Sequence, residues 1–284
     1  MLGTAVVNRL AGTGLEITAT ARTSSRFSNP AVNWQLFSAA GNELDELVRD
    51  LGEGDYVVNC IGLIKHRIDD SEINSRHEAI LANSLLPYSI AQLAGKQGFQ
   101  VVQIATDCVY DGTEGSYSEE ASHNATDVYG KSKSLGEVPS PNILNIRCSI
   151  IGEETEEGPS LVGWLLSQPA GATISGYSDH HWNGVTTSAY ANVVAGLIAT
   201  SSKLAGTFHL VPSGSVDKGA LSALILEVFG RTDIDIVPTS TGKPIDRTLA
   251  TIHPEINQLL WTAGGYAAPP TIETMVRSLV PLAP

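Results

Sequence analysis

The sequence lacks several motifs that would indicate hydrolytic or metal-dependent chemistry. It contains no Gly-x-Ser-x-Gly elbow, no His-Glu-x-x-His helix and no Cys-x-x-Cys pair. Such motifs place a nucleophile or zinc ligands in the geometry that those reactions need. The sequence therefore gives no support to a hydrolase or a zinc enzyme, and we expect no metal site.

Basic residues and cysteines are both scarce. The 284 residues include 17 Lys and Arg against 30 Asp and Glu, a net charge of −13. This balance argues against nucleic acid or an anionic membrane surface as the main partner, although a local pocket can still bind a small anion. The three cysteines, Cys60, Cys108 and Cys148, are typical of small buried side chains in a reducing compartment.

Long apolar runs are also missing. The sequence has no stretch of 18 apolar residues and no signal-peptide pattern. Its 42% hydrophobic and 17% charged residues are ordinary for a globular enzyme of one or two domains. We expect a cytoplasmic protein that does not associate with membranes.

Apolar runs and amphipathic stretches alternate along the chain and predict an α/β fold with a doubly wound parallel sheet. The expected strands are 15–21, 34–37, 56–61, 101–105, 143–146, 206–211 and 234–237. The expected helices are 3–11, 43–51, 75–96 with a kink at Pro87, one that begins near Tyr129, 158–166, 187–201 and 218–229.

One pair of side chains has a clear chemical use. Tyr129 and Lys133 are four residues apart on a predicted helix, so they share one face. An ammonium beside a phenol favours phenolate and lowers its pKa, which would let Tyr129 act as a general acid or base. Thr106 ends the preceding buried strand, where open α/β sheets bind their ligands. The alternative is a chance pair on a solvated helix.

The residues around this pair resemble a known family. The segments Thr106-Asp107-Cys-Val-Tyr110-Asp111-Gly112, Tyr117-Ser-Glu119 and Tyr129-Gly-Lys-Ser-Lys133-x-x-Gly136-Glu137 are similar to those of extended short-chain dehydrogenase/reductases. The branch that they resemble is the dTDP-4-dehydrorhamnose reductase-like sugar-nucleotide reductases. The resemblance implies a Rossmann-type fold and a catalytic set of Thr106, Tyr129 and Lys133, with Lys133 also holding the nicotinamide ribose.

The strand expected at 15–21 ends in a loop that predicts the cofactor. NAD-binding sheets usually offer a carboxylate at this strand end, whereas an arginine accommodates the 2′-phosphate of NADP. Here the loop has no carboxylate but has Arg22, Ser24 and Arg26. We therefore expect NADPH rather than NADH. A polar loop that happens to hold two arginines is the alternative.

Two further segments are assigned to the cofactor by resemblance. Asn59-Cys60-Ile-Gly62 is similar to the family's Asn-Cys-Ala-Gly turn, and a glycine there lets the backbone approach the dinucleotide. It could equally be a simple turn. The family also places an asparagine beside the active site, so Asn83 either supports Lys133 or is a structural residue.

Candidate substrate residues lie in three segments. Asp107, Val109 and Tyr110 belong to the segment that resembles the family, and we assign them to substrate binding on that resemblance. The segment 176–187 resembles the family segment that closes over the sugar nucleotide, and it contributes His181 and Trp182. Asp246 and Arg247 are candidates because an arginine fork suits a diphosphate, with a surface ion pair as the alternative.

We expect a dinucleotide-binding domain at 1–151, to which 187–211 returns, and a substrate lobe made of 152–186 and 212–284. The expected reaction is NADPH-dependent reduction of a keto group on a nucleotide-activated 4-keto-6-deoxy sugar, with Tyr129 as proton donor; a homodimer is possible. Two alternatives remain: an NAD-dependent sugar-nucleotide epimerase or dehydratase, and a non-catalytic regulatory subunit that binds NADP.

The sequence also lacks the strand and Gly-rich turn with which dinucleotide-binding folds open. Met1-Leu2-Gly3-Thr4 resembles the end of that turn, with Gly3 as its last glycine. The missing strand is central in the usual strand order. We therefore expect a truncated or misassigned start, with roughly ten further residues in the functional protein.

Overall fold

A computed structural model describes residues 1–26, 29–41, 43–153 and 160–279. Its main sheet has four parallel strands in the order β10-β5-β4-β3. These are β3 (Tyr56–Asn59), β4 (Gln100–Thr106), β5 (Ile143–Cys148) and β10 (Gly206–His209). β4 lies between β3 and β5, and its apolar residues Val101, Val102 and Ala105 are buried, as expected for a strand covered on both faces. The predicted α/β class with a parallel sheet is confirmed.

Two strands stand apart from this sheet. β1 (Thr18–Ala21) and β2 (Asn33–Leu36) pair in parallel with each other, and no strand of the described chain joins β1 to β3. β1 is shorter than the strand expected at 15–21, because Gly14 turns with a φ of 79° and Leu15 is solvent-exposed. β1 and β2 therefore form a separate two-stranded sheet.

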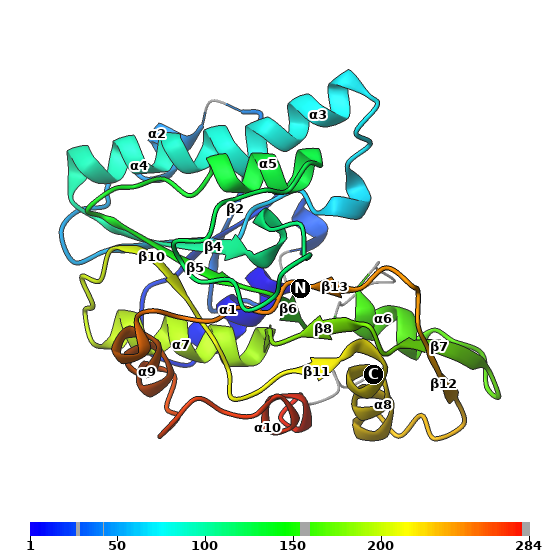
Figure 1. The fold of residues 1–284 in the computed structure, drawn as a ribbon. Coiled ribbons are helices and arrows are strands. Elements are labelled where there is room, and N and C mark those ends of the chain that lie inside the picture. Colours follow the sequence, from blue (N-terminus) through cyan, green and yellow to red (C-terminus); the bar gives the residue numbers. More distant parts are fainter. Residues whose placement is uncertain (27–28, 42, 154–159, 280–284) are drawn as a thin grey trace.

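Helices cover both faces of the main sheet (Figure 1). On one face lie α2 (Leu44–Leu47), α4 (Leu86–Gln97) and α5 (Val128–Leu135), and there Leu86 and Ile90 of α4 share a core with Val101 of β4. On the other face α1 (Leu2–Leu10) packs against α7 (Thr187–Ala199), and α9 (Pro254–Ala263) packs against α7 in turn. α2 is a single turn rather than the longer helix expected at 43–51.

The long helix expected at 75–96 is interrupted. α3 (Ile73–Ile80) passes through a π-helical turn (Leu81–Leu85) into α4. Pro87 has no N–H to donate to the carbonyl of Asn83, four residues earlier. Gly136 approaches that carbonyl so closely that a Cβ at this position would collide with it. The predicted kink at Pro87 is therefore a π turn, which exposes a backbone segment to contact with the residues after α5.

A second lobe lies beside the carboxyl ends of the main strands (Figure 1). β7 (Thr173–Tyr177) pairs with β12 (Asp235–Thr239), and β8 (His180–Trp182) lies between β11 (Val216–Asp217) and β13 (Ile245–Asp246). β6 (Ile150–Ile151) pairs with β9 (Val185–Thr186). Its helices are α6 (Leu161–Leu166), α8 (Lys218–Val228) and α10 (Ile272–Arg277). The two- and three-residue strands are too short to give a periodic signal, and sequence analysis missed them.

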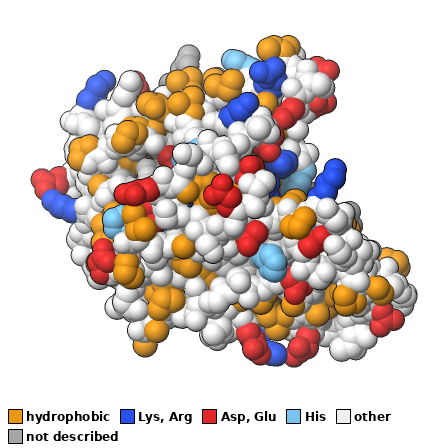
Figure 2. Space-filling view, viewed as in Figure 1, with side chains coloured by type: hydrophobic (Ala, Val, Ile, Leu, Met, Phe, Trp, Pro, Cys, Tyr) orange, Lys and Arg blue, Asp and Glu red, His pale blue; other side chains and the backbone are white. Residues whose placement is uncertain are grey.

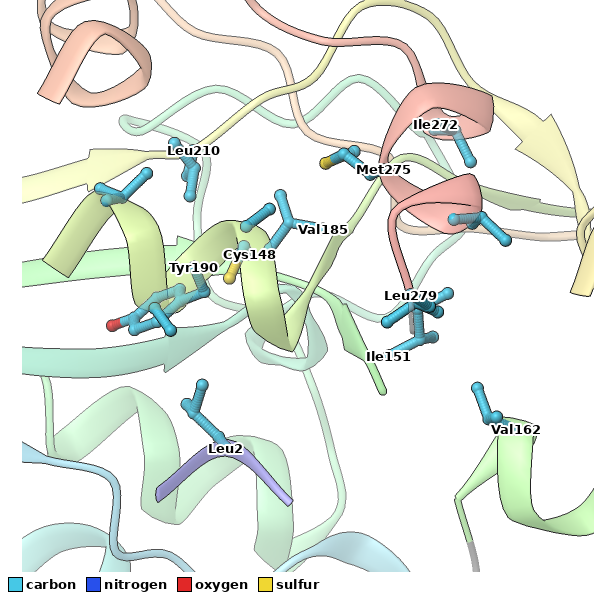
Figure 3. Close-up of a cluster of buried hydrophobic side chains, with 14 of the residues drawn as sticks. Leu2, Cys148, Ile151, Val162, Val185, Tyr190, Leu210, Ile272, Met275 and Leu279 are labelled. Atoms are coloured by element: carbon cyan, nitrogen blue, oxygen red, sulfur yellow. The ribbon is translucent and has the colours of Figure 1, made fainter. Parts of the chain in front are cut away.

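One apolar core connects the two parts of the molecule. It brings together Leu2 of α1, Cys148 at the end of β5, Tyr190 of α7 and Met275 of α10 (Figure 3). Burial of this apolar surface is the main force that holds the second lobe on the sheet. Across the described residues, no helix has both the length and the apolar character to cross a membrane.

Candidate active site

Helix α5 begins at a tightly packed turn. Asp127 is its N-cap and accepts a hydrogen bond from the Gly130 amide at 2.8 Å. The second carboxylate oxygen of Asp127 forms an ion pair with Lys65 at 2.7 Å. A Cβ on Gly130 would lie 2.5 Å from the carbonyl oxygen of Cys108, so the start of α5 is pressed against the turn that follows β4. This contact places Tyr129 next to the end of that strand.

Thr106 and Tyr129 meet at this point. The Thr106 hydroxyl donates to Oδ1 of Asp107 at 3.2 Å and is near enough to the Tyr129 phenol to affect its pKa. Burial raises the pKa of the Tyr129 phenol above its ordinary value, and the neighbouring Thr106 hydroxyl opposes that change. The expected lowering of this pKa is wrong for this structure, because burial raises it. Tyr129 is therefore a neutral phenol at physiological pH and can donate a proton.

Lys133 lies one turn later on α5 and is only 6% exposed. Its Nζ donates to the carbonyl oxygen of Ile104 at 2.8 Å. Burial lowers the pKa of Lys133 to about 8, and the charge of Glu137 opposes that change. The side chain is thus mainly an ammonium at neutral pH. It adds a positive charge at the end of β4.

Asn83 ties the turn after β3 to helix α5. Its Oδ1 accepts from the Leu63 amide at 2.7 Å, and its Nδ2 donates to Leu63 O and to Ser132 Oγ, both at 3.0 Å. A Cβ on Gly62 would lie 3.2 Å from Asn83 Oδ1 and 4.0 Å from Lys133 Nζ. Gly62, Asn83 and Lys133 are therefore brought together, with Asn83 fully engaged in structural bonds.

The remaining candidate cofactor residues fall into two places. A Cβ on Gly3 would lie 3.7 Å from Cβ of Cys60, so the first turn of α1 meets the turn after β3. Burial raises the pKa of the Cys60 thiol to about 12, which keeps it uncharged. Arg22 and Ser24 are exposed beyond β1, and the side chain of Arg26 lies outside the described residues.

These residues fit a phosphorylated dinucleotide. The first turn of α1 has no side-chain cap, so its amides are available to an anion, and the exposed Arg22 offers a cation at the end of β1. Gly62 brings the backbone of the turn after β3 close to the Lys133 ammonium. We find no group of three metal-ligating side chains in the part of the chain that the structure describes.

Two of the candidate substrate residues lie close to the pair. Asp107 is buried, which raises the pKa of its carboxyl group, and the nearby charge of Arg247 lowers it. Arg247 reaches across from the second lobe and donates from Nε to Tyr110 O at 2.8 Å and from Nη2 to Asp111 O at 3.1 Å. Its positive charge therefore stands at the end of β4.

Asp246 is held within its own segment. It accepts from the amide and hydroxyl of Thr248 at 2.9 and 2.6 Å. The alternative of a surface ion pair between Asp246 and Arg247 is not what the structure shows. His181 is exposed on β8, where the register pairs it with Asp246 on one side and Asp217 on the other.

The structure places three predicted substrate side chains in the core instead. Val109 and Tyr110 have no exposed surface and pack with Tyr117 and Leu249. The turn after Thr106 folds inward because this apolar pair finds partners there. Trp182 is also buried, and its Nε1 donates to Ser149 Oγ at 2.9 Å. As side chains, these three are structural in this conformation.

A buried charged cluster that was not predicted from the sequence lies behind α5. Arg147 of β5 is 2% exposed and bonds both carboxylate oxygens of Glu137, at 3.0 and 2.5 Å. It also donates to Tyr110 Oη at 2.7 Å, His209 Nε2 at 2.6 Å and His123 Nε2 at 2.9 Å. This cluster fixes the end of the helix that carries Lys133. The signal in the sequence that could have indicated this cluster is the presence of an arginine, Arg147, within an apolar strand.

Charged side chains of both signs gather where the two parts of the molecule meet. Figure 2 shows basic and acidic side chains on the right of the molecule, where the outline steps inward between the part that carries α3 and the second lobe.

The ion pair of Lys65 with Asp127 was also not predicted from the sequence, although an aspartate just before a predicted helix is an N-cap signal.

The chain is similar in sequence to a known protein family. Residues 1–253 match the family model described as the RmlD substrate binding domain. The chain is 26% identical over 262 residues to a protein of Haloferax volcanii named probable low-salt glycan biosynthesis reductase Agl14, covering 88% of this chain and 84% of that one.

Solved structures share the fold. A dTDP-4-dehydrorhamnose reductase from Bacillus anthracis str. Ames, in complex with NADP, has a TM-score of 0.70 and 19% identity, over 92% of this chain and 96% of that one. A UDP-glucuronic acid 4-epimerase from Bacillus cereus, in complex with NAD, has a TM-score of 0.69 and 12% identity, over 98% and 91%. At these identities the likeness establishes a Rossmann-like fold that reductases and epimerases both use.

Proposed function

The chain belongs to the RmlD substrate binding domain family, and from this premise we propose that it is an NADPH-dependent reductase of a keto group on a nucleotide-activated sugar. The substrate that we favour is a 4-keto-6-deoxy sugar. The observation that carries the proposal is the meeting of the Thr106 hydroxyl with the Tyr129 phenol at the end of β4, with the Lys133 ammonium one helical turn away.

In the proposed reaction, the side chains of the site have separate roles. NADPH, held by Arg22, Ser24 and Arg26 at one end and by Gly3, Cys60, Gly62, Asn83 and Lys133 along its length, would supply the hydride. Tyr129 is protonated at neutral pH and donates its proton to the oxygen of the former keto group. Thr106 donates a hydrogen bond to the same oxygen, and Lys133 stabilises the phenolate that Tyr129 becomes.

The charges near the site support an anionic substrate. Burial raises the pKa of the Asp107 carboxyl group and the positive charge of Arg247 opposes that change, while Lys65 contacts Asp127 directly. These two cations approach the end of β4 from different parts of the molecule. A diphosphate suits this setting, because arginine and lysine both bind phosphate oxygens.

A second candidate is an NAD-dependent sugar-nucleotide epimerase. The fold shared with the Bacillus cereus epimerase favours it, since the two structures overlap across 98% of this chain. The exposed Arg22, in a strand-end loop without a carboxylate, argues for NADPH instead. The expected alternative of a non-catalytic NADP-binding subunit would show binding without turnover.

The test is to incubate the protein with NADPH or NADH and a panel of 4-keto sugar nucleotides while following the absorbance of the reduced nicotinamide. We expect consumption of NADPH with at least one sugar and recovery of the corresponding hydroxy sugar. Conversion between sugars without net consumption would favour the epimerase. Tight binding of NADPH without turnover on any sugar would favour the regulatory subunit.

A further inference from the structure

Three buried amide side chains form a row across the main sheet. The register pairs Asn59 of β3 with Gln103 of β4, and Gln103 with Asn145 of β5. None of the three is more than 3% exposed. Gln103 lies two residues after Val101 and therefore on the same face, which packs against α4. Buried amides are costly unless they are hydrogen-bonded, so their partners show what the row holds in place.

The row ends on the carbonyl group that binds Lys133. Asn59 Nδ2 donates to Gln103 Oε1 at 2.8 Å, and Gln103 Nε2 donates to the Ile104 carbonyl oxygen at 3.1 Å. The same oxygen accepts from Lys133 Nζ at 2.8 Å. Both acceptor positions of this carbonyl oxygen are therefore occupied by side-chain donors.

The strand pairing explains why side chains reach this carbonyl. β3 pairs with β4 only as far as Asn59 and Gln103, so no residue of β3 lies opposite Ile104. β5 continues to pair with β4 up to Thr106. The end of β3 thus leaves space at Ile104, and the amide of Gln103 and the ammonium of Lys133 enter it.

We propose that Gln103, held by Asn59, is a positioning residue for the Lys133 ammonium. Its amide fixes the direction of the Ile104 carbonyl, and this carbonyl is the hydrogen-bond acceptor of Nζ. A carbonyl that turns would move the ammonium relative to Tyr129, four residues earlier on α5. The consequence for catalysis rests on the proposed function, whereas the effect on Lys133 does not.

The groups that face Lys133 come from three elements. Glu137 lies four residues later, just beyond the end of α5, Cys60 follows β3, and Cys148 ends β5. Burial raises the pKa of both thiols, so they stay neutral near pH 8. Glu137 supplies the attractive charge and the Ile104 carbonyl supplies the hydrogen bond. A change at Gln103 therefore acts on a side chain with few other supports.

A double-mutant cycle on unfolding tests the proposal without any substrate. Gln103→Met and Lys133→Met are measured singly and together. We expect the combined change in the unfolding equilibrium constant to differ at least roughly fivefold from the product of the single changes, because the two side chains share one acceptor. If the change in the unfolding equilibrium constant of the double mutant equals the product of the two single changes, the proposal is overturned.

Asn145 provides the matched control. It occupies the next place in the row, but its amide donates to Val138 O and Thr207 Oγ1 rather than to Ile104. A cycle of Asn145→Leu with Lys133→Met should be multiplicative within about twofold. Equal coupling in both cycles would mean that the row acts through general packing, which would also overturn the proposal.

A second variant serves if Gln103→Met does not fold. Gln103→Glu keeps an acceptor for Asn59 but cannot donate to Ile104 as a carboxylate, and it adds a negative charge near Nζ. We expect the pKa of Lys133, measured from the pH dependence of its acylation by mass spectrometry, to rise by about one or more. Lys131, exposed on the same helix, should keep its profile. An unchanged Lys133 profile would contradict the proposal.

Turnover gives the third measurement. Gln103→Met should lower kcat roughly tenfold and shift its pH profile, with the KM for the sugar nucleotide changed by less than about threefold. An unchanged kcat and pH profile would count against positioning. If the unmodified protein reduces no keto sugar, the proposed function fails, and the unfolding cycle and the acylation profile still decide the role of Gln103.

Discussion

Helix α5 and the loop after β1 serve the same proposed reaction but are fixed very differently. α5 is bonded through Asp127 to Lys65, through Ser132 to Asn83 and through Lys133 to the β4 backbone. In the loop, Arg22 and Ser24 are exposed. The comparison teaches that changes around α5 should alter both stability and turnover, whereas changes in the loop should alter the choice of cofactor alone.

The largest effect is expected at Tyr129. Tyr129→Phe removes the proposed proton donor and little else, so turnover should fall roughly 10²- to 10⁴-fold. The dissociation constant of NADPH should change by no more than a few-fold, because the phenol is not its main contact. Tyr88→Phe, which changes an exposed tyrosine on α4, is the control. Turnover that survives in Tyr129→Phe would remove Tyr129 from the reaction.

Loss of the arginine behind α5 should damage the fold. Arg147→Met leaves the buried Glu137 without its cation and removes donors from Tyr110, His123 and His209. We expect the free energy of unfolding to fall by about 3–5 kcal/mol. Denaturant titration measures it, with Arg277→Met, an exposed arginine, as a control of small effect. Equal midpoints for the two variants would show that the buried cluster does not stabilise α5.

Acid should weaken the same cluster. His209 accepts from Arg147 at Nε2 and donates to Ala250 O from Nδ1, so it is held neutral. Burial and the Arg147 charge lower its pKa to about 4 from an ordinary value of 6.5, while Glu119 opposes the change and the neighbouring His123 adds to it. Because the unfolded chain binds the proton more readily, this contribution to stability is present above pH 6.5 and is lost as pH falls towards 4.

The difference between the ordinary pKa of His209 and its pKa in the folded protein sets the size of the expected loss of stability. The free energy of unfolding should be about 2 kcal/mol lower at pH 5 than at pH 7.5 from His209 alone. Urea titrations at the two pH values measure it, and His209→Gln should reduce the dependence whereas His66→Gln, at an exposed histidine, should not. A pH dependence that is the same in all three proteins would assign the effect to other groups.

The smallest effect is expected in the loop. Arg22→Ala should reduce the preference for NADPH over NADH roughly tenfold, about the contribution of one hydrogen bond to a charged group. Stability and kcat with saturating NADPH should stay close to those of the unmodified protein. Arg49→Ala, also exposed, is the control. A preference that is unchanged in Arg22→Ala would place recognition of the 2′-phosphate elsewhere.

Much of the fold could be predicted from the sequence because its signals are local. The buried run 101–105, the helix that starts near Tyr129 and their order specify where Thr106 and Tyr129 meet. Short strands such as β8 and β13 carry no such signal, since their pairing is decided by segments that are distant in sequence. The helices α9 and α10 were not predicted either. They lie in the C-terminal region, where the sequence pattern mixes helix and strand signals.

The chemical properties of the site could be predicted less well than the fold, because they depend on long-range packing. The inward turn of Tyr110 requires Tyr117 and Leu249, and the bridge between these two joins segments far apart in the chain. The raised pKa of Tyr129 results from burial, which spacing to Lys133 does not reveal. The polar row through Gln103 becomes visible only when β3, β4 and β5 are in register.

The central claim is that a hydride passes from NADPH to a keto carbon of a sugar nucleotide while Tyr129 donates the proton. The most direct measurement uses NADPH carrying deuterium at the transferable position of the nicotinamide ring, a 4-keto-6-deoxy sugar nucleotide and the intact protein. Mass spectrometry and NMR of the product should show one deuterium on the former keto carbon and one NADP formed per sugar reduced. A converted sugar without deuterium, or NADPH that is bound but never consumed, would contradict it.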